Sequence, residues 1–499
     1  MPTEKKHKFS DYFYNRITYG GVALALLVFI IECLLFGIDF FTNGANFYLG
    51  ILTYVFLPPF LILGLILIPL GAAWKHKRIL KGISESAPKT LFIDPAIPTH
   101  RNAIFVFLIG TSILMVMTII GSYKAFHYTE SVHFCGVTCH DVMKPEYATY
   151  LNSPHARVKC VECHIGPGAN WYVKSKLSGL RQVYHTIKND YAKPIPTPVQ
   201  NLRPSAETCE QCHWPGKFYS SVELRRTYRS TEADQPDPWS LRMLIHVGRD
   251  EKKDYGIHSH MYVDQDVYYV ADDQKRQVIS WVKTIGKDGK EEIFTTPDSP
   301  YKDKEPPQSL VRKMDCMDCH NRPSHRFEPP FDLINRAMND GKINPQIPSI
   351  KSKAMEVLSK PYKTEQEALQ AIPKTILEYY QNKHPEFYQS HQEDIKKSAD
   401  EIVILFKNNI FPERKARWDI YPDNIGHLVS PGCFRCHDDQ HAAASGKTIT
   451  KNCNSCHSII EQGTASSIEK STDGLTFRHP FNEDESWKEM NCTDCHTGN

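Results

Sequence analysis

Seven short motifs, each with two cysteines followed at once by a histidine, constrain this sequence more than any other feature. Six have the pattern Cys-x-x-Cys-His: Cys160/Cys163/His164, Cys209/Cys212/His213, Cys316/Cys319/His320, Cys433/Cys436/His437, Cys453/Cys456/His457 and Cys492/Cys495/His496. The seventh, Cys135/Cys139/His140, has one more residue between its cysteines. Of the 15 cysteines in the chain, Cys33 alone lies outside these motifs. The sequence after residue 123 must therefore fold around whatever the motifs bind.

The spacing of the motifs is typical of covalent attachment sites for c-type haem. Two nearby thiols bond to one edge of a porphyrin, and the adjacent imidazole reaches the iron. Disulfides would not require a histidine after each second cysteine, and zinc ribbons pair two Cys-x-x-Cys units without these histidines. We therefore expect seven haem c groups, held by all fourteen motif cysteines and by the seven motif histidines.

Three apolar runs near the N-terminus, over residues 17–36, 47–73 and 103–122, are each close to or above the length of about 20 residues that a membrane-spanning helix needs. Pro58, Pro59 and Pro69 should kink the second helix. The first run could also be a cleaved signal peptide, but no small-residue cleavage site follows it. Lys and Arg precede the first span and separate the second from the third, so the N-terminus should be cytoplasmic and the cysteine-rich part should lie outside.

We expect a membrane-anchored multihaem protein, with three N-terminal transmembrane helices and a mainly helical and loop outer domain. Porphyrins, rather than side chains, should form the core of this domain. Runs rich in β-branched and aromatic residues at 267–270, 278–282 and 292–294 predict a small β-insert. Thr364 and Glu367 look like a capping box that opens a helix, and residues 386–407 predict a second helix. The predicted divisions are 1–122 (anchor), 123–235 (haems 1–3), 236–345 (β-insert and haem 4), 346–415 (helical spacer) and 416–499 (haems 5–7).

Each iron that only passes electrons needs a second axial ligand. The chain has 23 histidines, of which thirteen lie outside the motifs and beyond the third apolar run, enough for seven irons. Position in the sequence favours eight of them: His155, His185, His258, His260, His325, His427, His441 and His479. Met143 is a further ligand candidate for the first haem, because a thioether raises the reduction potential relative to imidazole.

The segments 134–143, 155–164, 174–185 and 209–213 resemble the NapC/NirT/NrfH family of membrane-anchored quinol dehydrogenases. The chain as a whole is similar to the inner-membrane heptahaem cytochromes c of metal-reducing bacteria. The resemblance implies that menaquinol docks beside the first haem, with Met143 and His140 as alternative iron ligands and with Lys174 or Lys176 lining the quinol pocket. Asp141 and Glu146 are proposed proton acceptors.

The net charge of +2 gives no electrostatic case for nucleic acid as a partner. The sequence thus predicts a quinol:cytochrome c oxidoreductase of the bacterial inner membrane, whose haem domain is periplasmic. It would take electrons from the membrane quinone pool and pass them through seven haems to periplasmic or outer-membrane cytochromes. Two alternatives are a terminal multihaem reductase of a small oxyanion, which needs a haem with an open axial position, and an electron relay or sensor that never contacts quinol. Optical haem reduction by a menaquinol analogue discriminates among the three.

Overall fold

The computed structural model describes residues 12–41, 52–81, 95–138, 140–166, 168–199, 203–231, 237–249, 256–260, 264–480 and 485–496. The chain divides into two compact units, Met1–Thr138 and Cys139–Asn499.

The first unit is helical. It contains α1 (Arg16–Phe41), the π-helical turn η2 (Leu52–Phe56), α3 (Leu57–Leu80), α4 (Pro98–Thr129) and the π-helical turn η3 (Phe134–Thr138). Among its described residues, three helices are long and apolar enough to cross a membrane, over Arg16–Ile38, Leu57–Ile79 and Leu108–Thr129. The prediction of three membrane-spanning helices therefore agrees with the structure in number and type.

The predicted helix boundaries need two corrections. Pro58 and Pro59 stand in the first turn of α3, directly after the π-helical turn η2, so the helix changes type at the prolines and the second span begins as a π-helix, which was not predicted. The part of the predicted second span before Leu52 lies outside the described residues. Helix α4 continues to Thr129, beyond the end of the apolar run at residue 122.

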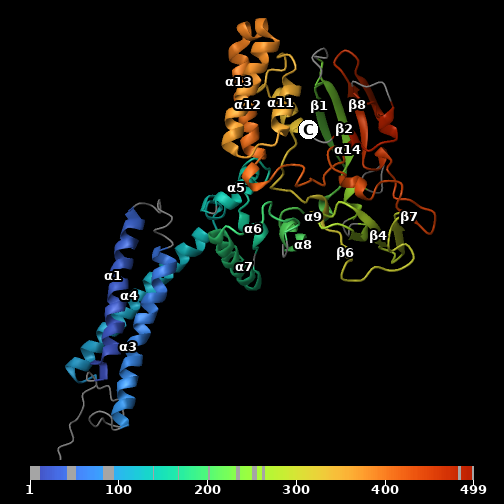
Figure 1. Cartoon of the computed structure of the whole chain (residues 1–499). Helices are drawn as coiled ribbons and strands as arrows, with labels where there is room; N and C mark the ends of the chain where they lie inside the picture. The colour runs from blue at the N-terminus through green and yellow to red at the C-terminus, as the bar shows by residue number, and fades with distance from the viewer. Residues whose placement is uncertain are drawn as a thin grey trace, which may run out of the picture. The chain divides into compact units, whose positions relative to one another are not determined.

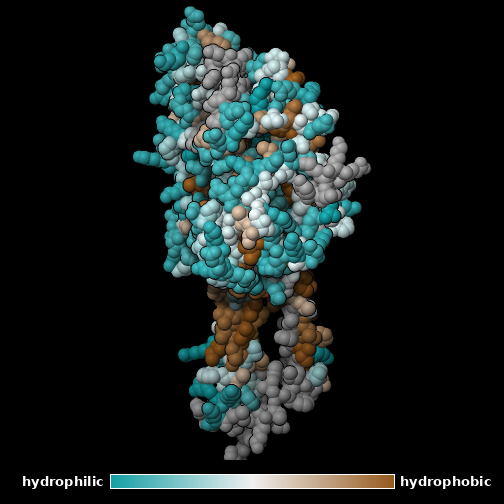
Figure 2. Space-filling model, turned by 90° about the vertical axis from the view of Figure 1, so that its right-hand side faces the viewer, coloured by the Kyte–Doolittle hydropathy of each residue, from teal (hydrophilic) through white to brown (hydrophobic). Residues whose placement is uncertain are grey.

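Helices α1 and α3 approach each other through small residues. A Cβ atom on Gly21 would lie 2.8 Å from the Gly64 carbonyl oxygen, and a Cβ on Gly64 would lie 2.7 Å from the Ala25 nitrogen. Close backbone contact of this kind is the usual way in which helices associate in lipid, where apolar side chains gain nothing by leaving the acyl chains. The outward faces are apolar, as the brown helices in Figure 2 show.

The second unit contains two antiparallel β-sheets. One has the order β6-β3-β4-β5-β7 and the other the order β1-β2-β8-β9. Their strands are β1 (Ser221–Tyr228), β2 (Trp239–His246), β3 (Gln265–Ala271), β4 (Ile279–Gly286), β5 (Glu291–Thr295), β6 (Arg312–Lys313), β7 (Ala442–Ala443), β8 (His457–Gly463) and β9 (Glu469–Leu475). The predicted β-insert is present as β3, β4 and β5. The four-stranded sheet was not predicted, and it joins β2 to β8 across more than two hundred residues of sequence, as the neighbouring green and red strands in Figure 1 show.

The longer helices of the second unit are α5 (His140–Leu151), α7 (Ala169–Lys188), α10 (Pro330–Asn339), α11 (Ile350–Ser359), α12 (Glu365–Lys383) and α13 (Pro385–Asn409). The short ones are α6 (Cys160–His164), α8 (Ser205–Thr208), α9 (Cys316–Cys319), α14 (Cys492–Cys495), η4 (Cys209–Gln211), η5 (Pro215–Lys217), η6 (Ile257–His260), η7 (Pro412–Arg414), η8 (Gly432–Arg435), η9 (Cys453–Ser455) and η10 (Ser486–Lys488). Both helices predicted for the spacer are present. The Thr364 hydroxyl accepts a hydrogen bond from the Glu367 N–H (3.1 Å) at the start of α12.

The expectation that porphyrins alone form the core of the outer domain is wrong for residues 327–421. Helices α10 to α13 surround an ordinary aliphatic and aromatic core, and α12 and α13 run side by side next to α11 (Figure 1). Leu333, Ile372, Tyr380 and Phe406 are among the side chains that are fully buried there. This segment carries none of the cysteine motifs, so its helices must bury their own apolar faces.

Candidate haem sites

Each regular motif occupies a single helical turn. The turn is α-helical at α6, α9 and α14 and of the 3-10 type at η4, η8 and η9. In the α9 motif, for example, the His320 N–H donates to the Cys316 carbonyl oxygen (2.7 Å). One turn brings residues i and i+3 to the same side of the chain, so both thiols of a motif face one porphyrin edge. Each motif therefore has the local geometry that covalent attachment requires.

Cys212 and Cys456, the second cysteines of the third and sixth motifs, close their 3-10 turns in the same way. The Cys212 N–H donates to the Cys209 carbonyl oxygen (3.1 Å), and the Cys456 N–H donates to the Cys453 carbonyl oxygen (3.2 Å). Cys212 is exposed and Cys456 is half-buried, and neither forms a disulfide. Haem attachment at these two cysteines stays a prediction that the turn geometry supports.

Two motifs share a capping device that the sequence analysis missed. In the fourth motif, the Asp318 carboxylate accepts from the Asp315 N–H (2.8 Å) while the Asp315 carboxylate accepts from the Met317 N–H (2.9 Å). Asn491 and Asp494 form the matching box in the seventh motif. The signal was readable, because an Asp or Asn precedes the first cysteine and an Asp precedes the second in both motifs.

The extra residue of the first motif coincides with a change in helix type. The turn over Phe134–Thr138 is π-helical, and a π-turn takes in one residue more than an α-helical turn. Cys139 lies outside the described residues, as do the side chains of His140 and Asp141. Met143 is half-buried on α5. The structure thus offers a reason for the longer spacing, while the ligand of the first iron stays a prediction.

Six motif histidines each face a histidine from elsewhere in the sequence. The ring centres lie 5.8–6.4 Å apart in the pairs His164–His325, His213–His155, His320–His258, His437–His260, His457–His427 and His496–His479. Two imidazoles bound on opposite sides of one metal ion, each at a metal–nitrogen distance of about 2 Å, place their ring centres about 6 Å apart. The separations fit an iron atom between the rings of every pair.

Hydrogen bonds to Nδ1 of the outer histidines support this fit. Backbone carbonyl oxygens lie 2.8–3.1 Å from Nδ1 of four outer histidines, namely His155, His258, His260 and His325. A carbonyl at Nδ1 keeps the proton on that nitrogen, which leaves Nε2 unprotonated and free to bind a metal. The same carbonyl fixes the orientation of the ring, as partners of metal-bound histidines usually do.

The protonation state of the rings also suits a metal. Burial lowers the pKa of seven of these twelve imidazoles: His164, His258, His260, His320, His325, His427 and His496. For His325 the pKa falls to about 4. A neutral imidazole is the form that binds metals, so these rings need not lose a proton at neutral pH to act as ligands.

The cysteines offer no competing structure among the described residues. Thirteen motif cysteines are described, and none of them forms a disulfide: Cys135, Cys160, Cys163, Cys209, Cys212, Cys316, Cys319, Cys433, Cys436, Cys453, Cys456, Cys492 and Cys495. Within the same described ranges, no three or more His, Cys, Asp or Glu side chains are arranged to hold a metal ion unaided. The residues present therefore fit haem c better than they fit a disulfide or a zinc site.

Several motifs that follow one another in the sequence also lie next to one another in the structure. The Cys163 thiol interacts electrostatically with Cys209, the Cys209 and Cys316 thiols share a hydrogen bond, and Cys319 interacts with Cys433. At the other end, the Cys492 sulfur lies 3.6 Å from His427 Nδ1, which belongs to the sixth site. The motifs from the second to the fifth thus form a continuous row, and the sixth and seventh are neighbours.

One turn joins the fourth and fifth sites especially tightly. His258 and His260 both lie in η6, two residues apart, yet they face motif histidines that are more than a hundred residues apart. The buried Asp318 adds a second link. Its carboxylate binds Arg312 Nε (2.8 Å), and its carbonyl oxygen accepts from Arg435 Nη2 (2.8 Å), a residue of the fifth motif.

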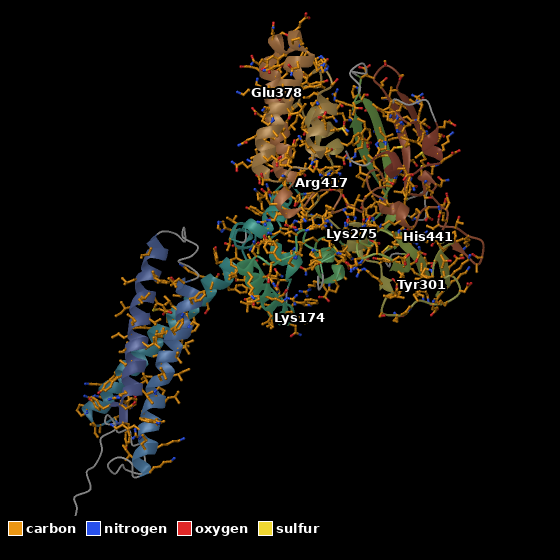
Figure 3. The ribbon with its side chains drawn as sticks, viewed as in Figure 1. Lys174, Lys275, Tyr301, Glu378, Arg417 and His441 are labelled. Atoms are coloured by element: carbon orange, nitrogen blue, oxygen red, sulfur yellow. The ribbon has the colours of Figure 1, made fainter. Side chains whose placement is uncertain are left out.

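Two of the eight favoured histidines do not face a motif histidine among the described residues. His441 is fully buried, with Nδ1 bound to Asp438 (2.9 Å) and Nε2 lying 3.1 Å from the Ile279 carbonyl oxygen. With both nitrogens hydrogen-bonded, His441 does not face a motif histidine, and we infer a structural role for it beside the five-stranded sheet (Figure 3). His185 lies in the last turn of α7, and its Nδ1 lies 2.8 Å from the Asp190 carboxylate.

The residues expected around the quinol lie on α5 and α7. Lys174 is exposed at the edge of the second unit, where Figure 3 labels it, and its Nζ lies 5.0 Å from the centre of the Trp171 ring. Lys176 Nζ lies at the same distance from the Tyr172 ring. Both lysines therefore sit over aromatic rings of their own helix, a position from which an ammonium group can swing to another acceptor.

A small hollow beside α5 contains residues that sequence reasoning did not bring together. Its cavity volume is only about 10 Å³, and Glu146, Tyr191 and Arg414 contribute to its wall. Burial raises the pKa of the Glu146 carboxyl. The Arg414 guanidinium donates to the Tyr191 hydroxyl (2.6 Å). Because these residues come from segments far apart in the sequence, no local pattern could have predicted the hollow.

Comparison with known proteins agrees with this picture. Residues 97–195 match the family described as NapC/NirT cytochrome c family, N-terminal region. The cytochrome c-type protein ImcH of Geobacter sulfurreducens is 38% identical over 490 residues, which cover 98% of this chain and 96% of that protein. The cytochrome c-type protein TorY of Escherichia coli O157:H7 is 31% identical over 88 residues, 15% of this chain and 24% of that protein. No solved structure matches the chain.

Proposed function

Because this chain belongs to the NapC/NirT family of c-type cytochromes, we propose that it is a membrane-anchored quinol dehydrogenase. In this proposal it oxidises menaquinol from the quinone pool of the bacterial inner membrane and delivers the electrons to periplasmic or outer-membrane cytochromes. The N-terminus is cytoplasmic and the second unit is periplasmic. The observation that carries the proposal is the set of six facing histidine pairs, which would supply two histidine ligands to a haem iron at six of the seven motifs.

Fully ligated sites favour electron transfer over reduction of a bound substrate. Haem c, when attached to all seven motifs, supplies one-electron carriers. The residues that would hold it are the fourteen motif cysteines, the motif histidines and the six outer histidines of the pairs. At the first motif the chain provides His140 and Met143, and we assign the quinol to this site because its ligand set differs from the others and because it follows directly on a candidate membrane span.

The chain's own residues would handle the quinol protons. Lys174 and Lys176, on the helix that follows the second motif, would donate hydrogen bonds to a quinol hydroxyl. An ammonium group near a hydroxyl favours its ionised form and so eases proton loss. Asp141, next to His140, would accept the proton and release it to the outer aqueous side. The continuous row from the second motif to the fifth, and the neighbouring sixth and seventh sites, support transfer of electrons from site to site.

Replacement of Lys174 and Lys176 together by alanine should slow haem reduction by a menaquinol analogue. Loss of a charged hydrogen bond costs roughly 1.5–3 kcal/mol, which corresponds to a fall of about tenfold to a hundredfold in rate. Reduction by dithionite should not change. The measurement is the absorbance of reduced haem after anaerobic mixing.

The matched control replaces Lys374 and Lys397 by alanine. These lysines are exposed on α12 and α13, each in an i,i+4 ion pair, so their loss removes the same charge from a part of the domain without motifs. The control should keep the wild-type rate. If the Lys174/Lys176 variant were reduced as fast as this control, neither lysine would line the quinol pocket.

A further inference from the structure

Helix α7 exposes an apolar stripe along its whole length. Val173, Leu177, Leu180, Tyr184 and Ile187 are 53–80% exposed. They follow one another at intervals of four and three residues, which places them on one face of the helix. At a rise of about 1.5 Å per residue, the stripe extends for about 20 Å.

Other amphipathic helices in the same unit have the opposite orientation, with their apolar face turned toward the core. On α12, Ile372, Ile376 and Tyr380 are fully buried and the polar residues face outward. An amphipathic helix of a soluble domain normally turns its apolar stripe toward the core. A contiguous apolar surface that faces outward usually marks a site of interaction with a membrane or with another protein.

The charges of α7 indicate what covers the stripe. The helix carries Lys174, Lys176, Arg181 and Lys188, and no Asp or Glu. Residues 174, 181 and 188 are seven apart, so they form a basic row along one edge of the stripe. A basic row beside an apolar face is the pattern of helices that lie in a bilayer interface, where acyl chains meet anionic head groups.

The chain itself brings a bilayer within reach. In the sequence, α7 follows the candidate span Leu108–Thr129 of α4, with η3, α5 and α6 between them. A tether of this kind holds the helix at a high effective concentration near lipid, so even weak affinity for the surface is enough. A protein that bound the same stripe would not be held near it by such a tether.

We propose that α7 lies in the surface of an anionic phospholipid bilayer. Its apolar stripe would enter the boundary between head groups and acyl chains, and Arg181 and Lys188 of its basic row would face lipid phosphates. This contact goes beyond the proposed quinol chemistry, because it needs neither quinol nor electron transfer. It would also bring Lys174 and Lys176 to the depth at which a lipid-soluble quinol presents its head group.

Photo-crosslinking from the lipid side tests this proposal on the intact protein. The full-length, haem-loaded chain is reconstituted in phosphatidylglycerol and phosphatidylethanolamine vesicles that contain a phospholipid with a diazirine in its acyl chain. After illumination and proteolysis, mass spectrometry locates the adducts. Peptides from residues 173–187 should carry adducts at least tenfold more often than peptides from α12, the amphipathic helix with a polar outer face.

A variant with Leu177→Ser and Leu180→Ser provides the second measurement. Adducts on its α7 peptides should fall at least tenfold, while those on α3 stay at the wild-type level and the haem spectrum is unchanged. Adducts on wild-type α7 no more frequent than those on α12 would overturn the proposal and assign the stripe to a porphyrin or to another protein. Adducts on α7 in a chain that fails to oxidise menaquinol would contradict the proposed function alone.

Discussion

A chain in which Cys135 and Cys139 are both replaced by alanine should carry one haem fewer and should no longer be reduced by menaquinol. The remaining six motifs are intact, so dithionite should still reduce their haems. If the quinol delivers its electrons to the first site, the next site is too far from the quinol to replace it. Misplaced reacting groups cost about a hundredfold even for displacements near 1 Å, and we expect at least that loss here.

The control for this experiment removes the last motif instead. Replacement of Cys492 and Cys495 by alanine should also cost one haem, which the mass of the intact protein measures. Haem reduction by menaquinol should keep its wild-type initial rate in this variant, since the first site is untouched. Equal loss of quinol-driven reduction in both variants would show that the first motif has no special role.

Replacement of His260 by alanine should open the axial position of a single haem. His260 faces His437 with ring centres 5.8 Å apart, and its neighbour His258 faces His320 at 6.4 Å. Without His260, the fifth motif alone should bind carbon monoxide after reduction, at about one equivalent per chain. A chain that lacks both His258 and His260 should bind twice as much, because the two residues serve different irons.

His441 supplies the matched control. It is a buried histidine that follows the fifth motif closely in the sequence, but both of its ring nitrogens are hydrogen-bonded. Its replacement by alanine should add no carbon monoxide binding. It should instead lower the free energy of unfolding by roughly 1–3 kcal/mol for each buried partner left without a hydrogen bond. Binding of carbon monoxide to the His441 variant, or none to the His260 variant, would overturn the ligand assignment.

Features that depend on neighbours in the sequence were predictable. The motifs could be recognised because both thiols and the imidazole must lie within one turn. The three apolar helices could be recognised because each must satisfy its own backbone hydrogen bonds in lipid. The start of α12 followed from Thr364 and Glu367.

Features that depend on distant residues were not predictable. The sheet that pairs β2 with β8 joins segments without any local sign of partnership. His441 was favoured because it follows the fifth motif closely, yet closeness in sequence does not turn a ring toward an iron. His325 shows the opposite case. It lies five residues after His320 but faces His164, so the eight favoured histidines could be named while their partners could not.

The central claim is that quinol reduces this protein directly, and anaerobic mixing with a reduced menaquinone analogue tests it most simply. The purified full-length chain, in lipid nanodiscs, is mixed with the quinol while the absorbance of reduced haem is followed. We predict that haem reduction begins at once and that its rate rises with quinol concentration to a limit. An absorbance that stays unchanged with quinol, in a sample that dithionite reduces fully, would contradict the account.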